Sequence, residues 1–136
     1  MEIKIRDRKS PGFISFAIIG REASEEWLIA ETTFHLNGFN AEFGFSLMLG
    51  DLVSFFQELQ VLHRDLKGVA QLRSIEDNVH LTFNIDELGH VNVDGTLRDS
   101  SYTIETKFLM ETDQTYLSEI LNDCRQLLRE LKVEIN

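Results

Sequence analysis

Residues 27–47 read WLIAETTFHLNGFNAEFGFSL, and this stretch decides the fold. Two alternating runs flank Asn37-Gly38, the dipeptide best suited to a type I′ turn because both central residues of that turn need positive φ. The turn predicts a hairpin that pairs Leu36 with Phe39, Phe34 with Ala41, Thr32 with Phe43, Ala30 with Phe45 and Leu28 with Leu47 on one apolar face. A slip of one residue would expose four phenylalanines, so the register is strongly specified.

More strands follow and precede this hairpin. A second hairpin is predicted over Val79–Asp86 and His90–Leu97, closed by a three-residue loop whose Gly89 takes the left-handed position. The remaining strands are predicted at Ile3–Arg6, Phe13–Ile19 and Val69–Glu76 and over the alternating residues 102–110. The chain therefore carries about eight strands.

Two amphipathic helices are predicted at about 51–67 and 113–132, each with an apolar stripe at helical spacing. Gly68 is placed to end the first helix, and Cys124 lies in the apolar stripe of the second, where a thiol behaves as a small hydrophobe. The helices superpose at an offset of 62, which matches Asp51 with Asp113, and either a duplication or chance would produce that match.

The order of elements is ββββα-ββββα, which predicts an α+β fold. Because short loops join successive strands, we expect a mostly antiparallel meander sheet of about eight strands with both helices packed on one face. The length of 136 residues and the lack of any Pro, Gly or Ser-rich linker favour a single domain over residues 1–136.

The net charge of −10 is distributed unevenly along the chain. Residues 22–63 carry seven acids and no Lys or Arg. A field of this sign repels phosphate backbones and anionic lipid, so we expect no nucleic-acid or membrane partner and favour a basic protein partner. Solubility alone is the alternative explanation of the acidity. The charged N-terminal residues 1–9 lack a signal-peptide core, and the single Cys forms no internal disulfide, so a cytoplasmic location is expected.

Catalytic and metal-binding patterns are absent from the sequence. The four histidines show no helical metal-ligand spacing, and no HExxH, GxSxG or phosphate-binding glycine loop occurs. We therefore expect no catalytic residue, metal or cofactor. A pair of facing carboxylates in a cleft is the one enzymatic arrangement that residue counts alone leave open.

An acidic surface is the remaining candidate site. It comprises the polar face of the first hairpin and the loop before it, and its predicted partner-binding residues are Glu22, Glu25, Glu26, Glu31, Thr33, His35, Asn40 and Glu42. An inhibitor with such a surface could imitate the phosphate field that a nucleic-acid-binding enzyme expects, and charge would speed its association.

Scattered positions along most of the chain resemble WapI-type immunity proteins. They are Trp27-Leu28, Phe39, Ala41-Glu42-Phe43, Asp51-Leu52, Phe55, Leu59, Leu66-Lys67-Gly68-Val69-Ala70, Gly89, Gly95 and Asp113-Gln114-Thr115-Tyr116-Leu117. These positions are structural in kind, so the resemblance implies a shared fold more than a shared target. It also implies a small bacterial cytoplasmic antidote to a WapA-type toxin, several of which attack RNA.

The sequence thus predicts a non-enzymatic acidic binding protein that neutralises a cognate toxin, a nuclease among the candidates, by protein-protein interaction. The alternative is a small cytoplasmic domain that binds a small ligand between sheet and helices. A weaker third alternative is a carboxylate-based enzyme. Oligomeric state is left open by the sequence.

Overall fold

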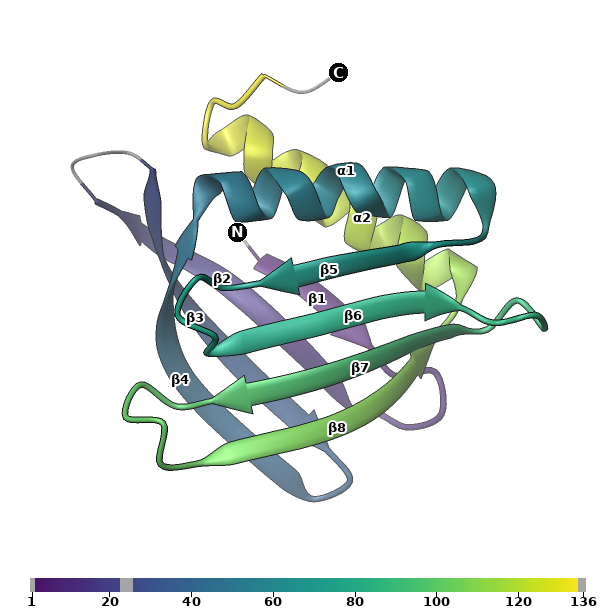
Figure 1. Ribbon diagram of the computed structural model, residues 1–136, viewed down its shortest axis with the longest axis horizontal. Helices are drawn as coiled ribbons and strands as arrows, with labels where there is room; N and C mark the ends of the chain where they lie inside the picture. The colour runs from purple at the N-terminus through teal and green to yellow at the C-terminus, as the bar shows by residue number, and fades with distance from the viewer. Residues whose placement is uncertain (1, 23–25, 135–136) are drawn as a thin grey trace.

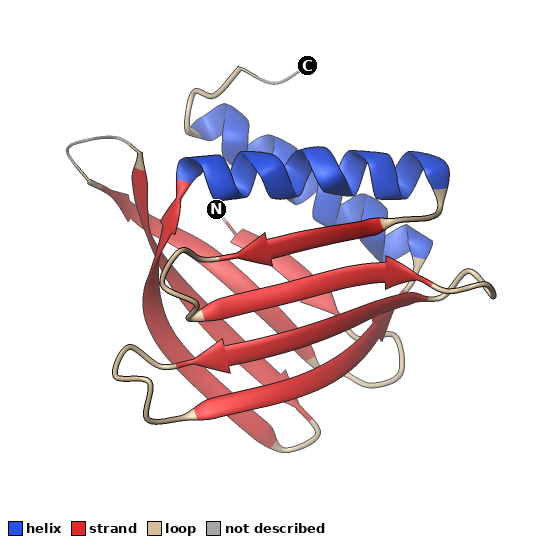
Figure 2. Cartoon of the chain, in the orientation of Figure 1, coloured by secondary structure: helices blue, strands red, loops and turns tan. Residues whose placement is uncertain are grey.

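The computed structural model describes residues 2–22 and 26–134. Within them the chain forms β1 (Glu2–Arg6), β2 (Phe13–Arg21), β3 (Trp27–Leu36), β4 (Phe39–Met48), α1 (Leu49–Asp65), β5 (Val69–Arg73), β6 (Val79–Ile85), β7 (Val91–Arg98), β8 (Glu105–Thr112) and α2 (Gln114–Glu130) (Figures 1 and 2). The predicted α+β class and the order ββββα-ββββα are confirmed.

The eight strands form two antiparallel sheets, with strand orders β1-β2-β3-β4 (sheet A) and β5-β6-β7-β8 (sheet B). The meander is therefore divided in the middle, where α1 separates β4 from β5. Figure 1 shows the two sheets facing each other at an angle, with both helices crossing along one side. Within the residues that the structure describes, neither helix is long and apolar enough to cross a membrane.

Both predicted hairpin registers are confirmed. All ten residues on the apolar face of the β3–β4 hairpin pair as expected, from Leu36 with Phe39 to Leu28 with Leu47. Asn37 and Gly38 have φ values of 51° and 86°, as a type I′ turn requires. In the β6–β7 hairpin, Leu81 lies opposite Gly95, and Gly89 has a φ of 84°.

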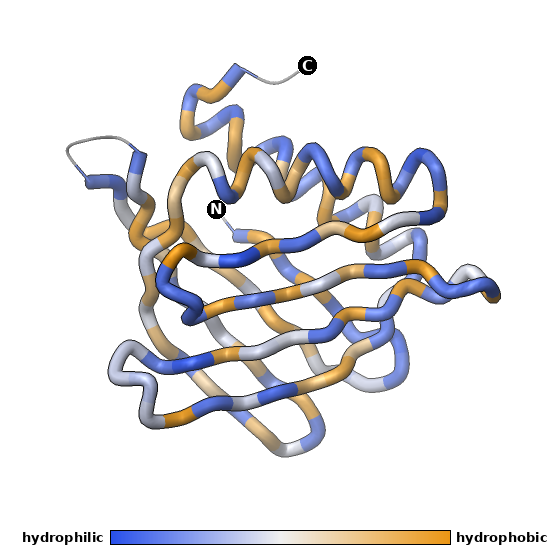
Figure 3. The backbone as a smooth tube through the Cα atoms, in the orientation of Figure 1, coloured by the Kyte–Doolittle hydropathy of each residue, from blue (hydrophilic) through white to orange (hydrophobic). Residues whose placement is uncertain are grey.

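The core lies between the sheets and beneath the helices. Phe34 of β3 and Phe108 of β8 join the sheets, with ring centroids 4.6 Å apart, and Phe55 of α1 lies 5.6 Å from Phe83 of β6. Cys124 is buried in this core, as predicted, and its burial raises the pKa of the thiol. Hydrophobic and hydrophilic residues alternate along the strands (Figure 3), so each sheet has one face for the core and one for solvent.

Three local predictions were wrong. The strand expected over residues 102–110 begins only at Glu105, because Asp99 accepts the backbone N–H groups of Thr103 and Ile104 and holds them in a loop. The first helix, expected to reach residue 67 and to end at Gly68, ends at Asp65, because Leu66 takes the left-handed conformation with a φ of 54°. The strand expected over Val69–Glu76 ends at Arg73, because the Asp77 N–H donates to the Ser74 carbonyl and turns the chain. Phe39 lies on the apolar face as predicted, but it is 71% exposed because it lies at the turn end of an edge strand.

The two helices are equivalent at an offset of 65 residues and not 62. The buried residues of α1 are Leu52, Phe55, Phe56, Leu59 and Leu62, and those of α2 include Leu117, Ile120, Leu121, Cys124 and Leu127. The sequence comparison failed because it matched two aspartates in different roles. Asp113 precedes α2 as its N-cap and accepts the Tyr116 N–H, whereas Asp51 lies within the first turn of α1.

Each helix also covers the first strand of the other half. Asp123 of α2 accepts the backbone N–H of Lys4 in β1 at 3.3 Å, and Glu58 of α1 accepts that of Gln71 in β5 at 2.8 Å. Glu58 and Asp123 are themselves related by the offset of 65, so the two halves are built alike.

Gly95 provides a test of the core. A Cβ atom at this position would lie 2.1 Å from the Phe108 ring, so Gly95→Ala should force the ring out of place and cost about 1–3 kcal/mol of unfolding free energy. At Gly44 the nearest atom would be the Ala30 carbonyl oxygen at 3.6 Å, and Gly44→Ala should change stability by less than about 0.5 kcal/mol. Guanidinium unfolding of both variants measures the difference, and equal losses would contradict the assigned packing.

Candidate binding surface

The predicted surface residues lie on the outer face of β3 and β4. Glu31, His35, Asn40 and Glu42 are exposed and Thr33 is partly exposed. Thr33 lies directly opposite Glu42, and His35 opposite Asn40. Glu31 is opposite Gly44, which makes Glu31 and Glu42 diagonal neighbours on one face. The structure thus brings these five residues together on a continuous ribbon.

The three other predicted residues belong to the connection between β2 and β3. Glu22 and Glu26 are exposed, and backbone bonds fix both positions: the Glu22 N–H donates to the Trp27 carbonyl and the Glu26 carbonyl accepts the Leu49 N–H. Glu25 lies outside the described residues. Glu26 directly precedes β3, about 16 Å from Glu31 at strand spacing, and its bond to Leu49 places it beside the start of α1.

A row of ordered side chains crosses all four strands of sheet A. The Lys4 ammonium of β1 lies 4.2 Å from the Phe13 ring centroid of β2, and that ring is 5.2 Å from the His35 ring of β3. His35 in turn hydrogen-bonds Asn40 of β4 through Nδ1 and Oδ1. Sequence reasoning missed Lys4 and Phe13, because no local signal showed that β2 pairs with β3 in this register.

Charge divides this sheet face into two parts. Its cations belong to β1, where Arg6 lies 4.0 Å from Glu119 and Lys4 lies over the Phe13 ring. The β3–β4 part carries Glu31 and Glu42, which form no ion pair with any described residue. This second part therefore presents free negative charge with no cation beside it, and we call it the acidic ribbon: Glu31, Thr33, His35, Asn40 and Glu42.

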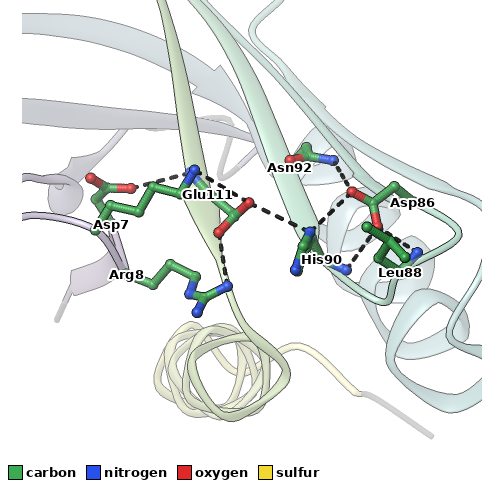
Figure 4. Close-up of polar contacts among 8 residues, drawn as sticks. Asp7, Arg8, Asp86, Leu88, His90, Asn92 and Glu111 are labelled. Atoms are coloured by element: carbon green, nitrogen blue, oxygen red, sulfur yellow. Dashed lines mark hydrogen bonds and ion pairs between the residues drawn. The ribbon is translucent and has the colours of Figure 1, made fainter.

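A polar network attaches the loop after β1 to sheet B (Figure 4). The Glu111 carboxylate of β8, whose side chain is 13% exposed, lies 2.9 Å from Arg8 Nη1, 3.7 Å from Lys9 Nζ and 3.8 Å from His90 Nδ1. Its backbone is also bonded, since the Glu111 N–H donates to Asp7 and its carbonyl accepts the Arg8 N–H. The basic N-terminal segment is thus engaged internally.

Asp86, beside this network, organises the β6–β7 loop. Its carboxylate accepts the backbone N–H of His90 at 3.0 Å, the Asn92 side chain at 3.3 Å and the backbone N–H of Leu88 at 2.9 Å. These donors, with His90 the largest cause, lower the pKa of Asp86. A lowered pKa means that this carboxylate stabilises the fold above the unfolded-state pKa of about 4, and that the contribution is lost as the pH falls through the folded-state value.

Asp86→Asn should therefore reduce stability at neutral pH and flatten the rise of stability between about pH 2.5 and pH 5. Urea unfolding over this pH range measures how the unfolding free energy depends on pH. Asp94→Asn is the matched control, because exposed Asp94 accepts no hydrogen bond from a described side chain or loop N–H. An unchanged acid limb in Asp86→Asn would show that the three donors do not favour the ionised form.

Two partly buried carboxylates each have a backbone partner, although Oδ2 of Asp51 accepts no hydrogen bond from a described residue. Burial raises the pKa of Asp51 and of Asp123, and each accepts a backbone N–H, from Met48 and from Lys4 respectively. No group of three or more His, Cys, Asp or Glu side chains suited to a metal ion occurs in the described ranges.

A hollow of about 570 Å³ lies on the outer face of sheet B and is open to solvent, unlike the ligand site expected between sheet and helices. The residues that line it include His80, Thr82, Asp94, Thr96 and Lys107.

The fold and this surface define a small α+β protein built of two ββββα halves, with unpaired carboxylates on the outer face of sheet A. The chain belongs to the WapI-like immunity protein family, whose family model matches residues 1–132. The resemblance seen in the sequence is thereby confirmed. Membership implies that the chain neutralises a cognate toxin and acts as a non-enzymatic protein. No curated protein matches the sequence.

Solved structures share the fold at very low identity. The crystal structures of Trypanosoma brucei MRP1/MRP2 match with a TM-score of 0.54 and 8% identity, covering 96% of this chain and 83% of that chain. The plant transcriptional regulator PBF-2 matches with a TM-score of 0.51 and 8% identity, covering 96% and 88%. At this identity the likeness shows the fold alone.

Proposed function

We propose that this chain neutralises its toxin by placing the acidic ribbon and the neighbouring Glu22 and Glu26 on a basic surface of the toxin. Glu25, outside the described residues, is proposed as a further contact from the sequence alone. The observation that carries the proposal is that Glu31 and Glu42 are exposed and unpaired among the described residues. A carboxylate already paired within its own chain would lose that partner on binding, whereas these two are available.

The rigidity of the surface supports the same proposal. Ten cross-strand pairs hold β3 against β4, and Phe34 behind the ribbon is 1% exposed, so the carboxylates project from a fixed backbone. The His35–Asn40 hydrogen bond and the contact with Phe13 order the side chains further. An ordered surface loses less conformational entropy when it binds.

The chemistry of the partner follows from the sign of the charge. A nuclease toxin must carry cations where it holds the phosphate backbone, and a negative ribbon would cover them and exclude the nucleic acid. The net charge of −10 would attract such a toxin over distance and speed the encounter. We place this event in the cytoplasm, where a toxin that attacks RNA finds its substrate.

Charge reversal tests the surface. The double variant Glu31→Lys with Glu42→Lys should slow association with the toxin, sought as the product of the gene immediately upstream, by about tenfold or more at low salt, and should flatten its salt dependence. Stopped-flow association at several salt concentrations measures both. Asp94→Lys with Glu87→Lys, two exposed sites on sheet B and its β6–β7 loop, is the control that makes the same change in net charge. Equal slowing in the two proteins, or none in either, would remove the acidic ribbon as the binding surface.

A further inference from the structure

Open sheet edges expose unpaired backbone groups that can accept another strand. The edge strands here are β1 and β4 in sheet A, and β5 and β8 in sheet B. Three of the four are at least partly closed by side chains. Asp123 bonds the backbone of β1, Glu58 bonds that of β5, and Asp7 bonds that of β8 at Glu111 (Figure 4).

The fourth edge, β4, has outward backbone groups at residues 40, 42, 44 and 46. The Lys4 N–H points away from β2, because it donates to Asp123. In an antiparallel sheet the backbone groups of successive residues point alternately toward the two sides of the strand. Followed through the pairs Lys4–Ser15, Ser15–Thr33 and Thr33–Glu42, this alternation directs the backbone groups of the even-numbered β4 residues away from β3. No hydrogen bond between described residues reaches these groups from outside the β3–β4 hairpin.

The sequence of β4 also lacks the residues that discourage pairing. Lys and Pro are the usual edge protection, and β8 carries Lys107 on its own outward edge. Strand β4 has neither residue between Phe39 and Met48, and its only charge is Glu42. This edge is ten residues long and suited to a strand that brings positive charge.

The inner face of β4 is also incompletely covered over residues 39–43. Phe39 is 71% exposed and Ala41 and Phe43 are only partly buried, although their β3 partners Leu36, Phe34 and Thr32 are all buried. An additional strand beside β4 would cover these three side chains and bury apolar area that the free protein leaves in water.

We propose that an extended segment of the toxin adds to β4 as a fifth strand of sheet A. The segment would alternate, with basic side chains beside Glu42 on the outer face and apolar side chains beside Phe39 and Phe43 on the inner face. The identity of the partner rests on the proposed function. A second copy of this chain is disfavoured as occupant, because it would bring two chains of net charge −10 and their Glu42 carboxylates together.

Amide hydrogen exchange by NMR tests the pairing in the wild-type complex with the toxin. In the free protein, the amides of residues 42, 44 and 46 should exchange fast, and those of 41, 43 and 45 slowly. In the complex, the first set should slow by at least tenfold. A complex that forms without this alternating protection overturns strand addition, while slowed association of the Glu31→Lys, Glu42→Lys variant would still uphold the acidic ribbon. Alternating protection that grows with concentration in the toxin-free protein also overturns it, in favour of self-pairing.

A matched pair of proline variants gives an independent measurement. Gly44→Pro removes one outward N–H of β4 and leaves the bonds to β3, so it should weaken toxin binding at least tenfold with little change in melting temperature. Lys107→Pro makes the same change on the outward edge of β8 and should leave binding unchanged. Equal affinities for the two variants overturn the proposal, and should Gly44→Pro fail to fold, the wild-type exchange pattern decides.

Discussion

The reciprocal packing of each helix on the sheet of the other half is the constraint on which this structure depends. Helix α1 follows sheet A but lies along β5, and α2 follows sheet B but lies along β1. Each contact buries an apolar helix stripe and also bonds an edge N–H that would otherwise be unpaired. Neither half can complete its core alone, so the two sheets are held facing each other.

This arrangement leaves the outer faces of the sheets free to serve binding. The inner positions of the strands are committed to the core, where a change of one methylene is felt. The side chains at the outer positions face solvent, and on β3 and β4 they form the acidic ribbon. Folding and the proposed binding thus use alternate residues of the same strands, an arrangement that would permit the target to change while the fold is kept.

Local signals account for what the sequence predicted correctly. Asn37-Gly38 fixed the β3–β4 register, Gly89 fixed the second turn, and the apolar stripes located both helices. The main errors concern information that is not local. The division into two sheets and the row from Lys4 and Phe13 to His35 depend on pairings between distant segments. The loop built around Asp99 is local, but it depends on one side chain whose bonds the alternating pattern does not show. The candidate-site residues on β3 and β4 could be found from the alternation of polar and apolar residues, whereas Lys4 on β1 and Phe13 on β2 could not.

The bond between Lys4 and Asp123 spans 119 residues of a chain of 136, and this separation has a consequence for biosynthesis. While the ribosome is still producing α2, the edge of β1 has no cover, so the first strand to be made is among the last to be completed. Contacts of such long range also make folding slow.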